Sequence, residues 1–188
     1  SNVSQLTLGG ATLKNIFGYR RVKSSTNFDL EGSRYDFFSS REDMSESQYS
    51  NEIQLLGTTL NDRLDYIVGA FYFYEKGSDY QRSDSFAGYG PLEAVRESYA
   101  DPITNEAYSF FGQVTYRPAF LEGLSFTGGV RQNYDIRSLF ARSQTNGICR
   151  LVDADVGGTP LDPCVKRVGE KFKKLTYTLS ADLKVTDD

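Results

Sequence analysis

Apolar and polar residues alternate most regularly between Gly123 and Asp135. Successive side chains of a β-strand point to opposite faces of the sheet, so every second residue belongs to one face. One face of this segment is mainly apolar and ends in a tyrosine, whereas the other is polar throughout. A strand of this length with these two faces is long for a soluble sheet and suits a tilted strand that crosses a bilayer.

The same alternation recurs along the chain and predicts an all-β fold. Ser4 to Leu8 is a short strand closed by Gly9-Gly10, a tight-turn signal. Leu64 to Glu75 is the most apolar segment, and periodicity leaves its register open because both of its faces carry apolar groups. We therefore expect an antiparallel up-and-down meander of about seven long strands, at residues 4–8, 11–22, 49–56, 64–75, 105–116, 123–135 and 173–185.

The predicted connections between these strands alternate in length. Short turns are expected at residues 9–10, 57–63 and 117–123, and long loops at residues 23–48, 76–104 and 136–171, with a short helix around residues 92–99. Outer-membrane barrels alternate in this way, with short periplasmic turns and long extracellular loops. Tyrosines near the strand ends fit the aromatic girdles of such barrels: Tyr19, Tyr49, Tyr72, Tyr74, Tyr108, Tyr116 and Tyr134.

Composition narrows the class of protein further. The 188 residues, with 24% charged and 39% hydrophobic side chains, are enough for one domain and are not typical of a disordered chain. No run of eighteen apolar residues occurs, which excludes a spanning helix but not a spanning strand. The net charge of −4 and the scattered Lys and Arg residues make nucleic acid an unsuitable partner.

The chain contains no histidine, and this bears on catalysis. Its absence removes Ser-His-Asp and Cys-His catalysis and the zinc ligand sets that contain histidine. Carboxylate pairs such as Glu42-Asp43 and Asp187-Asp188 lie in polar runs, where a solvated surface explains them. We therefore predict no catalytic residue, no metal ligand and no cofactor, and we expect that the protein is not an enzyme.

Five segments, taken in order, resemble the middle of the β-barrel of TonB-dependent outer-membrane receptors: LKNIFGYR at 13–20, SNEIQL at 50–55, YIVGAFY at 66–72, FGQVTY at 111–116 and LSFTGGVRQNYD at 124–135. The resemblance implies a segment of a 22-stranded transmembrane β-barrel in the outer membrane of a Gram-negative bacterium. It implies import of a scarce nutrient (siderophore, vitamin, sugar or aromatic compound) with energy from the TonB complex, which acts through an N-terminal plug domain. The family has no shared substrate motif here, so no binding residue is carried over.

The resemblance also sets expectations about the extent of the chain. We expect residues 1–188 to form a partial β-barrel domain, with the plug domain and the C-terminal strands absent and Ser1-Asn2 left from a cleaved tag. A sheet of seven strands cannot close a barrel of 22, so we expect a fragment that contacts lipid and self-associates through its strand edges.

Cys149 and Cys164 are the only cysteines and lie in the third predicted loop. An extracellular loop reached through an oxidising periplasm favours a disulfide between them, and closing this loop would contribute roughly 3 kcal/mol. A metal site is the alternative, but two thiols without histidine are too few ligands. Asp153-Ala154-Asp155, beside glycines, has the carboxylates of a calcium site without the rest of an EF-hand loop.

Two further groups of residues are candidate sites. Polar strand faces carry a possible lumen lining, which would either guide a polar ligand or form ion pairs between strands: Glu52, Gln113, Arg131, Asn133, Asp135 and Asp182. The first two predicted loops carry aromatic residues that would either contact a ligand or pack loop on loop: Arg34, Tyr35, Phe37, Phe38, Tyr80, Phe86, Tyr89 and Tyr99.

Two other kinds of protein share part of this pattern. A soluble lipocalin-like barrel binding a small hydrophobic ligand would need an apolar interior and a polar exterior, the reverse of the lumen assignment. A passive porin shares the alternation but lacks a plug domain.

Overall fold

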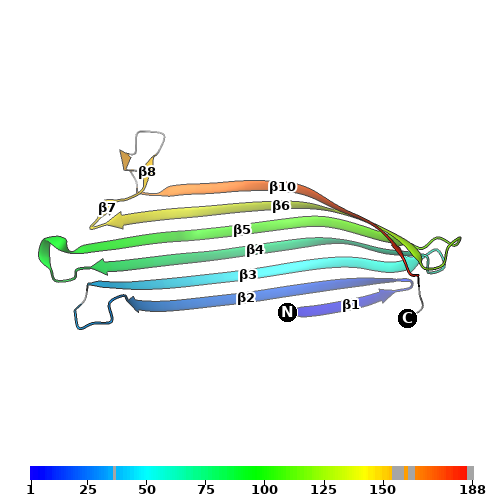
Figure 1. Cartoon of the computed structure of the whole chain (residues 1–188), viewed down its shortest axis with the longest axis horizontal. Coiled ribbons are helices and arrows are strands. Elements are labelled where there is room, and N and C mark those ends of the chain that lie inside the picture. Colours follow the sequence, from blue (N-terminus) through cyan, green and yellow to red (C-terminus); the bar gives the residue numbers. More distant parts are fainter. Residues whose placement is uncertain (36, 154–158, 161–163, 186–188) are drawn as a thin grey trace.

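The chain forms a single-layer antiparallel sheet in a computed structural model, which describes residues 1–35, 37–153, 159–160 and 164–185 (Figure 1). The strands are β1 (Asn2–Leu8), β2 (Ala11–Asp29), β3 (Phe38–Thr59), β4 (Leu64–Ser85), β5 (Ala94–Tyr116), β6 (Leu124–Thr145), β7 (Ile148–Cys149), β8 (Val152–Asp153), β9 (Thr159–Pro160) and β10 (Lys166–Leu183). Each long strand pairs with its neighbour in the order β1-β2-β3-β4-β5-β6-β10. The predicted all-β antiparallel meander is confirmed.

Short additional pairings lie beside this sheet. β7 pairs with the end of β6, and β8 and β9 form a separate two-stranded ribbon. The tight turns gather at one end of the sheet, and the connections at residues 30–37 and 86–93 lie at the other, which we call the loop end (Figure 1).

The predicted long loops are wrong over much of their length. β3 already begins at Phe38, β4 runs to Ser85 and β5 begins at Ala94, so paired strand replaces most of residues 23–48 and 76–104. The helix expected around residues 92–99 is also wrong, since only a 3-10 turn at Gly90–Leu92 precedes β5. Backbone pairing needs no apolar face, so a strand with water on both sides continues without the alternation that marks it in sequence.

Pairing along the long strands is continuous except at one irregularity in β5, which shifts its register against both β4 and β6. The register shifts between Gly77 and Asp79 on β4 and between Ala100 and Ile103 on β5. Asp101 and Pro102 together lie opposite a single residue of each neighbouring strand, so β5 has one extra residue here, and proline cannot donate to the ladder. The shift exchanges the faces of β5. Even-numbered residues before Asp101 therefore lie on the same side as odd-numbered residues after Pro102.

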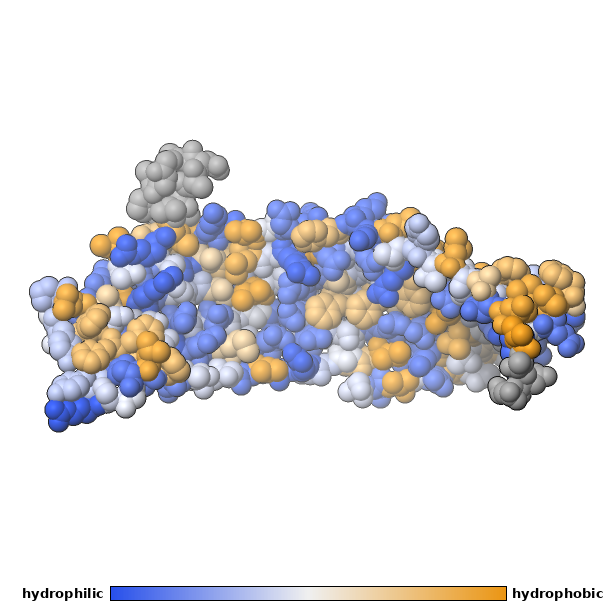
Figure 2. Space-filling model, viewed as in Figure 1, coloured by the Kyte–Doolittle hydropathy of each residue, from blue (hydrophilic) through white to orange (hydrophobic). Residues whose placement is uncertain are grey.

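The described part of the sheet has no hydrophobic core. No large apolar side chain of the described residues is buried, and Ser109 is the buried polar one. The accessible surface is 13175 Å², whereas a compact protein of this mass would expose roughly 9,000 Å². Apolar groups reach the surface at both ends of the sheet (Figure 2). This sheet therefore depends on other material to cover its faces.

Candidate functional site

One face of the sheet carries a band of apolar side chains, and we call it the banded face. The strand pairings align Leu13 with Leu55 and Leu55 with Val68, and on the far side of the sheet they align Val130 with Tyr177. The exposed fractions of Val68, Val130 and Tyr177 are 47%, 50% and 78%. The exposed surface of this band is thus mainly apolar, and it is interrupted by Asn15 and Asn51, which hydrogen-bond to each other at 3.1 Å.

Tyrosines bound this band on both sides. Tyr66 and Tyr116 lie toward the tight turns, and Tyr19, Tyr49 and Tyr74 form one cross-strand row on the other side. Next to that row, the Tyr108 and Tyr134 rings stack with centroids 4.8 Å apart. Leu64 to Tyr74 spans about 33 Å along β4, or about 25 Å across a bilayer at a 40° tilt. This height and the tyrosine borders match a lipid-facing barrel surface.

The other face, which we call the polar face, carries all six predicted lumen residues. The register places Glu52, Gln113, Arg131, Asn133, Asp135 and Asp182 together on this side, opposite the apolar band. An open depression of about 410 Å³ lies among Phe111, Gln113 and Arg131 and the threonines of β10. Their role as lumen lining stays a prediction.

The Arg131 side chain on the polar face contacts two phenyl rings and one asparagine. Its guanidinium carbon lies 5.8 Å from the centroid of the Phe71 ring and 5.5 Å from that of Phe111. Its Nε donates to Asn133 Oδ1 at 2.8 Å. The sequence did not point to Phe71, because both faces of residues 64–75 carry apolar groups.

Glu52 and Asp182 on this face are contacted by residues of their own strands. Gln54 Nε2 donates to Glu52, and Ser180 Oγ donates to Asp182 at 3.2 Å. Within the described residues, Glu52, Arg131, Asp135 and Asp182 make no ion pair with a neighbouring strand. The alternative of interstrand ion pairs is therefore not what holds these four side chains.

The predicted loop aromatics divide into two groups. Tyr35, Phe37, Phe86 and Tyr89 pack together at the loop end, with ring centroids 5.7 to 6.4 Å apart. Arg34 lies over the Tyr35 ring at 4.9 Å, and Phe38 is the first residue of β3. The structure thus shows the loop-on-loop packing, and ligand contact by these residues stays a prediction.

A backbone hydrogen bond joins these two loops, and a side chain of the first loop holds the start of β3. The Phe86 amide donates to the Phe37 carbonyl at 2.9 Å. The carboxylate of Glu31 accepts the amides of Phe37 at 2.5 Å and Phe38 at 3.1 Å. A carboxylate that takes two backbone amides fixes the start of β3.

The placement of Tyr80 and Tyr99 on a loop was wrong. Tyr80 belongs to β4 and Tyr99 to β5, and the two pair directly with ring centroids 4.6 Å apart on the banded face, beyond the tyrosine row. Burial and the neighbouring Tyr99 raise the pKa of Tyr80. The Ser, Asp and Arg residues around them resemble loop composition, which hid the strand.

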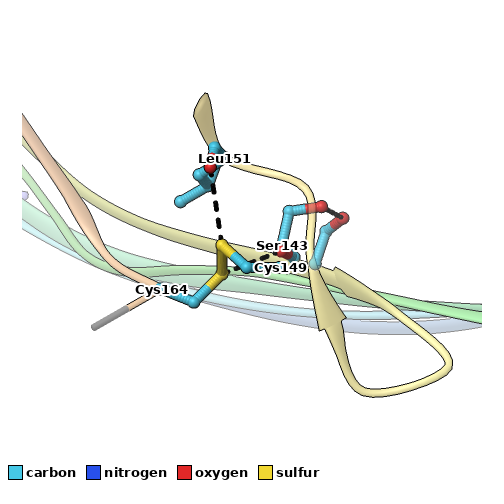
Figure 3. The surroundings of a disulfide bond; sticks show 5 residues. Ser143, Cys149, Leu151 and Cys164 are labelled. Carbon is cyan, nitrogen blue, oxygen red and sulfur yellow. Dashed lines mark hydrogen bonds between the residues drawn. A yellow bond between two sulfur atoms is a disulfide. The ribbon is translucent and has the colours of Figure 1, made fainter. Parts of the chain in front are cut away.

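The expected disulfide is present between Cys149 and Cys164 (Figure 3). It joins β7 to the segment before β10, and the Cys164 sulfur lies 3.1 Å from the Ser143 carbonyl oxygen of β6. The calcium expectation at residues 153–155 falls on Ala154 and Asp155, which lie outside the described residues, as do Asp187 and Asp188. Elsewhere in the described chain no group of three metal-binding side chains occurs.

Comparisons with known proteins agree with this geometry. The family model described as "TonB dependent receptor-like, beta-barrel" matches residues 2–188. The chain belongs to this family. This membership makes it part of an outer-membrane receptor barrel of a Gram-negative bacterium, in a family of transport receptors rather than enzymes. No match was found among curated protein sequences.

A similar solved structure supports the fold of this receptor barrel. The ferric yersiniabactin uptake receptor FyuA from Yersinia pestis matches with a TM-score of 0.72 at 14% identity. The match covers 98% of this chain and 25% of that one, so the chain spans about a quarter of the length of this structure. None of the helices in the described residues is long and apolar enough to cross a membrane.

Proposed function

We propose that this chain is part of the barrel of an outer-membrane receptor that takes up a scarce nutrient, driven by the TonB complex. The observation that carries the proposal is the two-faced sheet without a core. Its apolar band between tyrosine rows suits lipid, and the polar face suits a wet lumen. Belonging to the receptor family supports active rather than passive transport.

The polar face is the side that meets the ligand path. In this proposal residues 1–188 are a partial barrel domain of 22 strands in all, and the TonB complex acts through a plug domain outside these residues. Arg131, held between two phenyl rings and beside Asn133, presents a fixed positive charge to that path. The aromatic cluster at the loop end supplies contact surface for a ligand at the entrance.

Ferric siderophores are the first substrates to test, because the similar structure is titled a ferric yersiniabactin uptake receptor. Vitamins, sugars and aromatic compounds form the rest of the panel. The two rival functions make different predictions. A lipocalin-like barrel would be found in the soluble fraction, and a porin would pass its solute without TonB.

The test is uptake by the full-length protein in a Gram-negative host that lacks its own receptors. We expect accumulation of one radiolabelled substrate of the panel, and loss of that accumulation when TonB is deleted. The membrane fractions of both strains should contain the same amount of receptor. Uptake that persists without TonB would point to a porin and contradict the proposal.

A further inference from the structure

Three basic side chains lie on the banded face just beyond the tyrosine row, and we call them the basic patch. Arg21 on β2, Ser47 on β3 and Lys76 on β4 form the next cross-strand row after Tyr19, Tyr49 and Tyr74. Lys23 follows in the row after that, opposite Ser45, which in turn lies opposite Ser78. Ser47 thus separates Arg21 from Lys76, and all three cations are exposed.

Within the described part of the chain, the cations of the basic patch have no acidic partner. Among the described residues, Arg21, Lys23 and Lys76 form no ion pair. The nearest carboxylate on this face of β2 to β4 is Asp43, which accepts Arg41 Nε at 2.7 Å and the Ser25 hydroxyl at 2.6 Å. These hydrogen bonds, that of Arg41 first, hold the pKa of Asp43 below its usual range.

Other nearby carboxylates are also engaged or lie on the opposite face. Glu46 lies on the polar face, where it accepts Arg20 Nη2 at 3.2 Å. Glu106 lies in the row of Tyr74 and accepts the Tyr72 hydroxyl at 3.0 Å. The positive charge of the basic patch is therefore left for a partner outside the described chain.

The dimensions of the basic patch suit a phosphate. Neighbouring strands lie about 4.8 Å apart, so Arg21 and Lys76 stand about 10 Å apart across Ser47, and Lys23 lies about 7 Å further along β2. Beside Lys23 an open depression of about 490 Å³ is lined by Ser45, Ser78 and Tyr80, and also by Asp43, whose carboxylate already accepts hydrogen bonds from Arg41 and Ser25. Three long cationic side chains can converge on one anion there, and serine hydroxyls can bind attached polar groups.

The level of the basic patch in the membrane indicates which anion it binds. Tyrosine rows of barrels lie at the level of lipid headgroups, and the basic patch begins one row further toward the loop end. We propose that Arg21, Lys23 and Lys76 bind the phosphate groups of an anionic lipid headgroup in the outer leaflet, a proposal that rests on the outer-membrane placement of the proposed function. Acyl chains of the same lipid lie against the apolar band below.

The test measures lipid binding by the full-length receptor in neutral detergent, with bisphosphorylated lipid A as the probe and its dephosphorylated form as the comparison. The variant Arg21→Gln/Lys23→Gln/Lys76→Gln should bind the phosphorylated probe roughly a hundredfold more weakly, since each charge near an anionic surface contributes about tenfold or somewhat less. Raising the salt concentration should narrow the difference between the native receptor and this variant.

Two matched variants separate this site from general charge effects. Lys14→Gln/Lys166→Gln/Lys174→Gln removes the same charge from the polar face and should bind like the native receptor. Arg21→Lys/Lys23→Arg/Lys76→Arg keeps the charge of the basic patch and should retain most of the affinity. Equal loss of lipid affinity in the two glutamine variants would overturn the proposal. Displacement of lipid A by inorganic phosphate at a concentration similar to that of the lipid would also overturn it.

This experiment needs neither TonB nor a nutrient, so its outcome is separate from the uptake assay. Lipid binding that depends on the basic patch, in a receptor without TonB-driven uptake, would support the lipid site and contradict the proposed function. TonB-driven uptake by a receptor whose lipid binding does not depend on the basic patch would support the proposed function and contradict the lipid site.

Discussion

At the residue scale, the Phe111 ring covers Gly69 on the polar face and leaves no room for a side chain there. A Cβ atom at Gly69 would lie 2.5 Å from that ring and 2.7 Å from the backbone oxygen of Ile53. We expect Gly69→Ala to lower the free energy of unfolding by about 1–3 kcal/mol, because a backbone atom cannot move aside as a flexible side chain can. Urea unfolding of the full-length barrel in lipid vesicles measures this.

Gly112 provides the matched control for Gly69. It lies on the next strand, opposite Val68, and a Cβ there would meet the nearest atom at 3.5 Å, an ordinary contact. Gly112→Ala should leave the free energy of unfolding unchanged or raise it slightly, since strand glycines cost conformational entropy. If both variants were equally stable, the contact of Phe111 with Gly69 would not constrain the sheet.

The assignment of the two faces is also tested at single residues. Ile53 and Gln54 are adjacent in β3, Ile53 on the banded face at mid-height of the apolar band and Gln54 on the polar face. Ile53→Arg should cost about 2–4 kcal/mol of unfolding free energy, as an arginine facing lipid at mid-depth does. Gln54→Arg should cost much less, because it faces water and lies beside Glu52.

The same vesicle unfolding experiment compares these two variants. Equal costs for Ile53→Arg and Gln54→Arg would mean that the banded face does not contact lipid. A larger cost for Gln54→Arg would mean that the assignment of the faces is reversed, as in a barrel with an apolar interior.

At the element scale, the disulfide fastens the connection between β6 and β10. Its cysteines are 15 residues apart, and closing a loop of that size stabilises the folded state by roughly 3 kcal/mol. A reductant should therefore lower the unfolding free energy of the native receptor by about this amount. The variant Cys149→Ser/Cys164→Ser should already have the lower value and should not respond to the reductant.

Sequence alternation predicted the membrane-level part of each strand and missed the rest. Residues 11–22, 49–56 and 105–116 were predicted as strands because a bilayer on one side and water on the other impose the alternation. Beyond the tyrosine row both sides meet water, so Ser, Asp and Arg occupy both faces and the extension to Asp29 and Ser85 left no such signal. Tyr80 and Tyr99 were misplaced for the same reason.

The polar-face residues could be predicted as a set, but their partners could not. Alternation alone put Arg131, Asn133 and Asp135 on one side of β6. The neighbours of Arg131 come from β4 and β5, and they depend on a register that the apolar segment at residues 64–75 left open. Cross-strand contacts need that register, because a shift of one residue exchanges the two faces.

At the scale of the whole molecule, the sheet is held together by pairing between strands rather than by a core. The pairing of β6 with β10, for example, extends from the pair Leu124 and Leu183 to the pair Ala141 and Lys166. β1 and β10 lie at the two edges, and each pairs with one neighbour only in the described sheet. Such edges and an uncovered apolar band favour pairing with further strands and contact with lipid.

This architecture predicts how residues 1–188 behave when produced alone. In water, we expect no stable monomer, because the sheet exposes 13175 Å² and buries no large apolar side chain in its described part. Copies should associate through the strand edges and the banded face, with an association state that rises with concentration. Light scattering coupled to size-exclusion chromatography, with circular dichroism for strand content, measures this. Neutral detergent should reduce the association by covering the banded face, whereas a stable, strand-rich monomer in plain buffer would mean that the chain finds a core of its own.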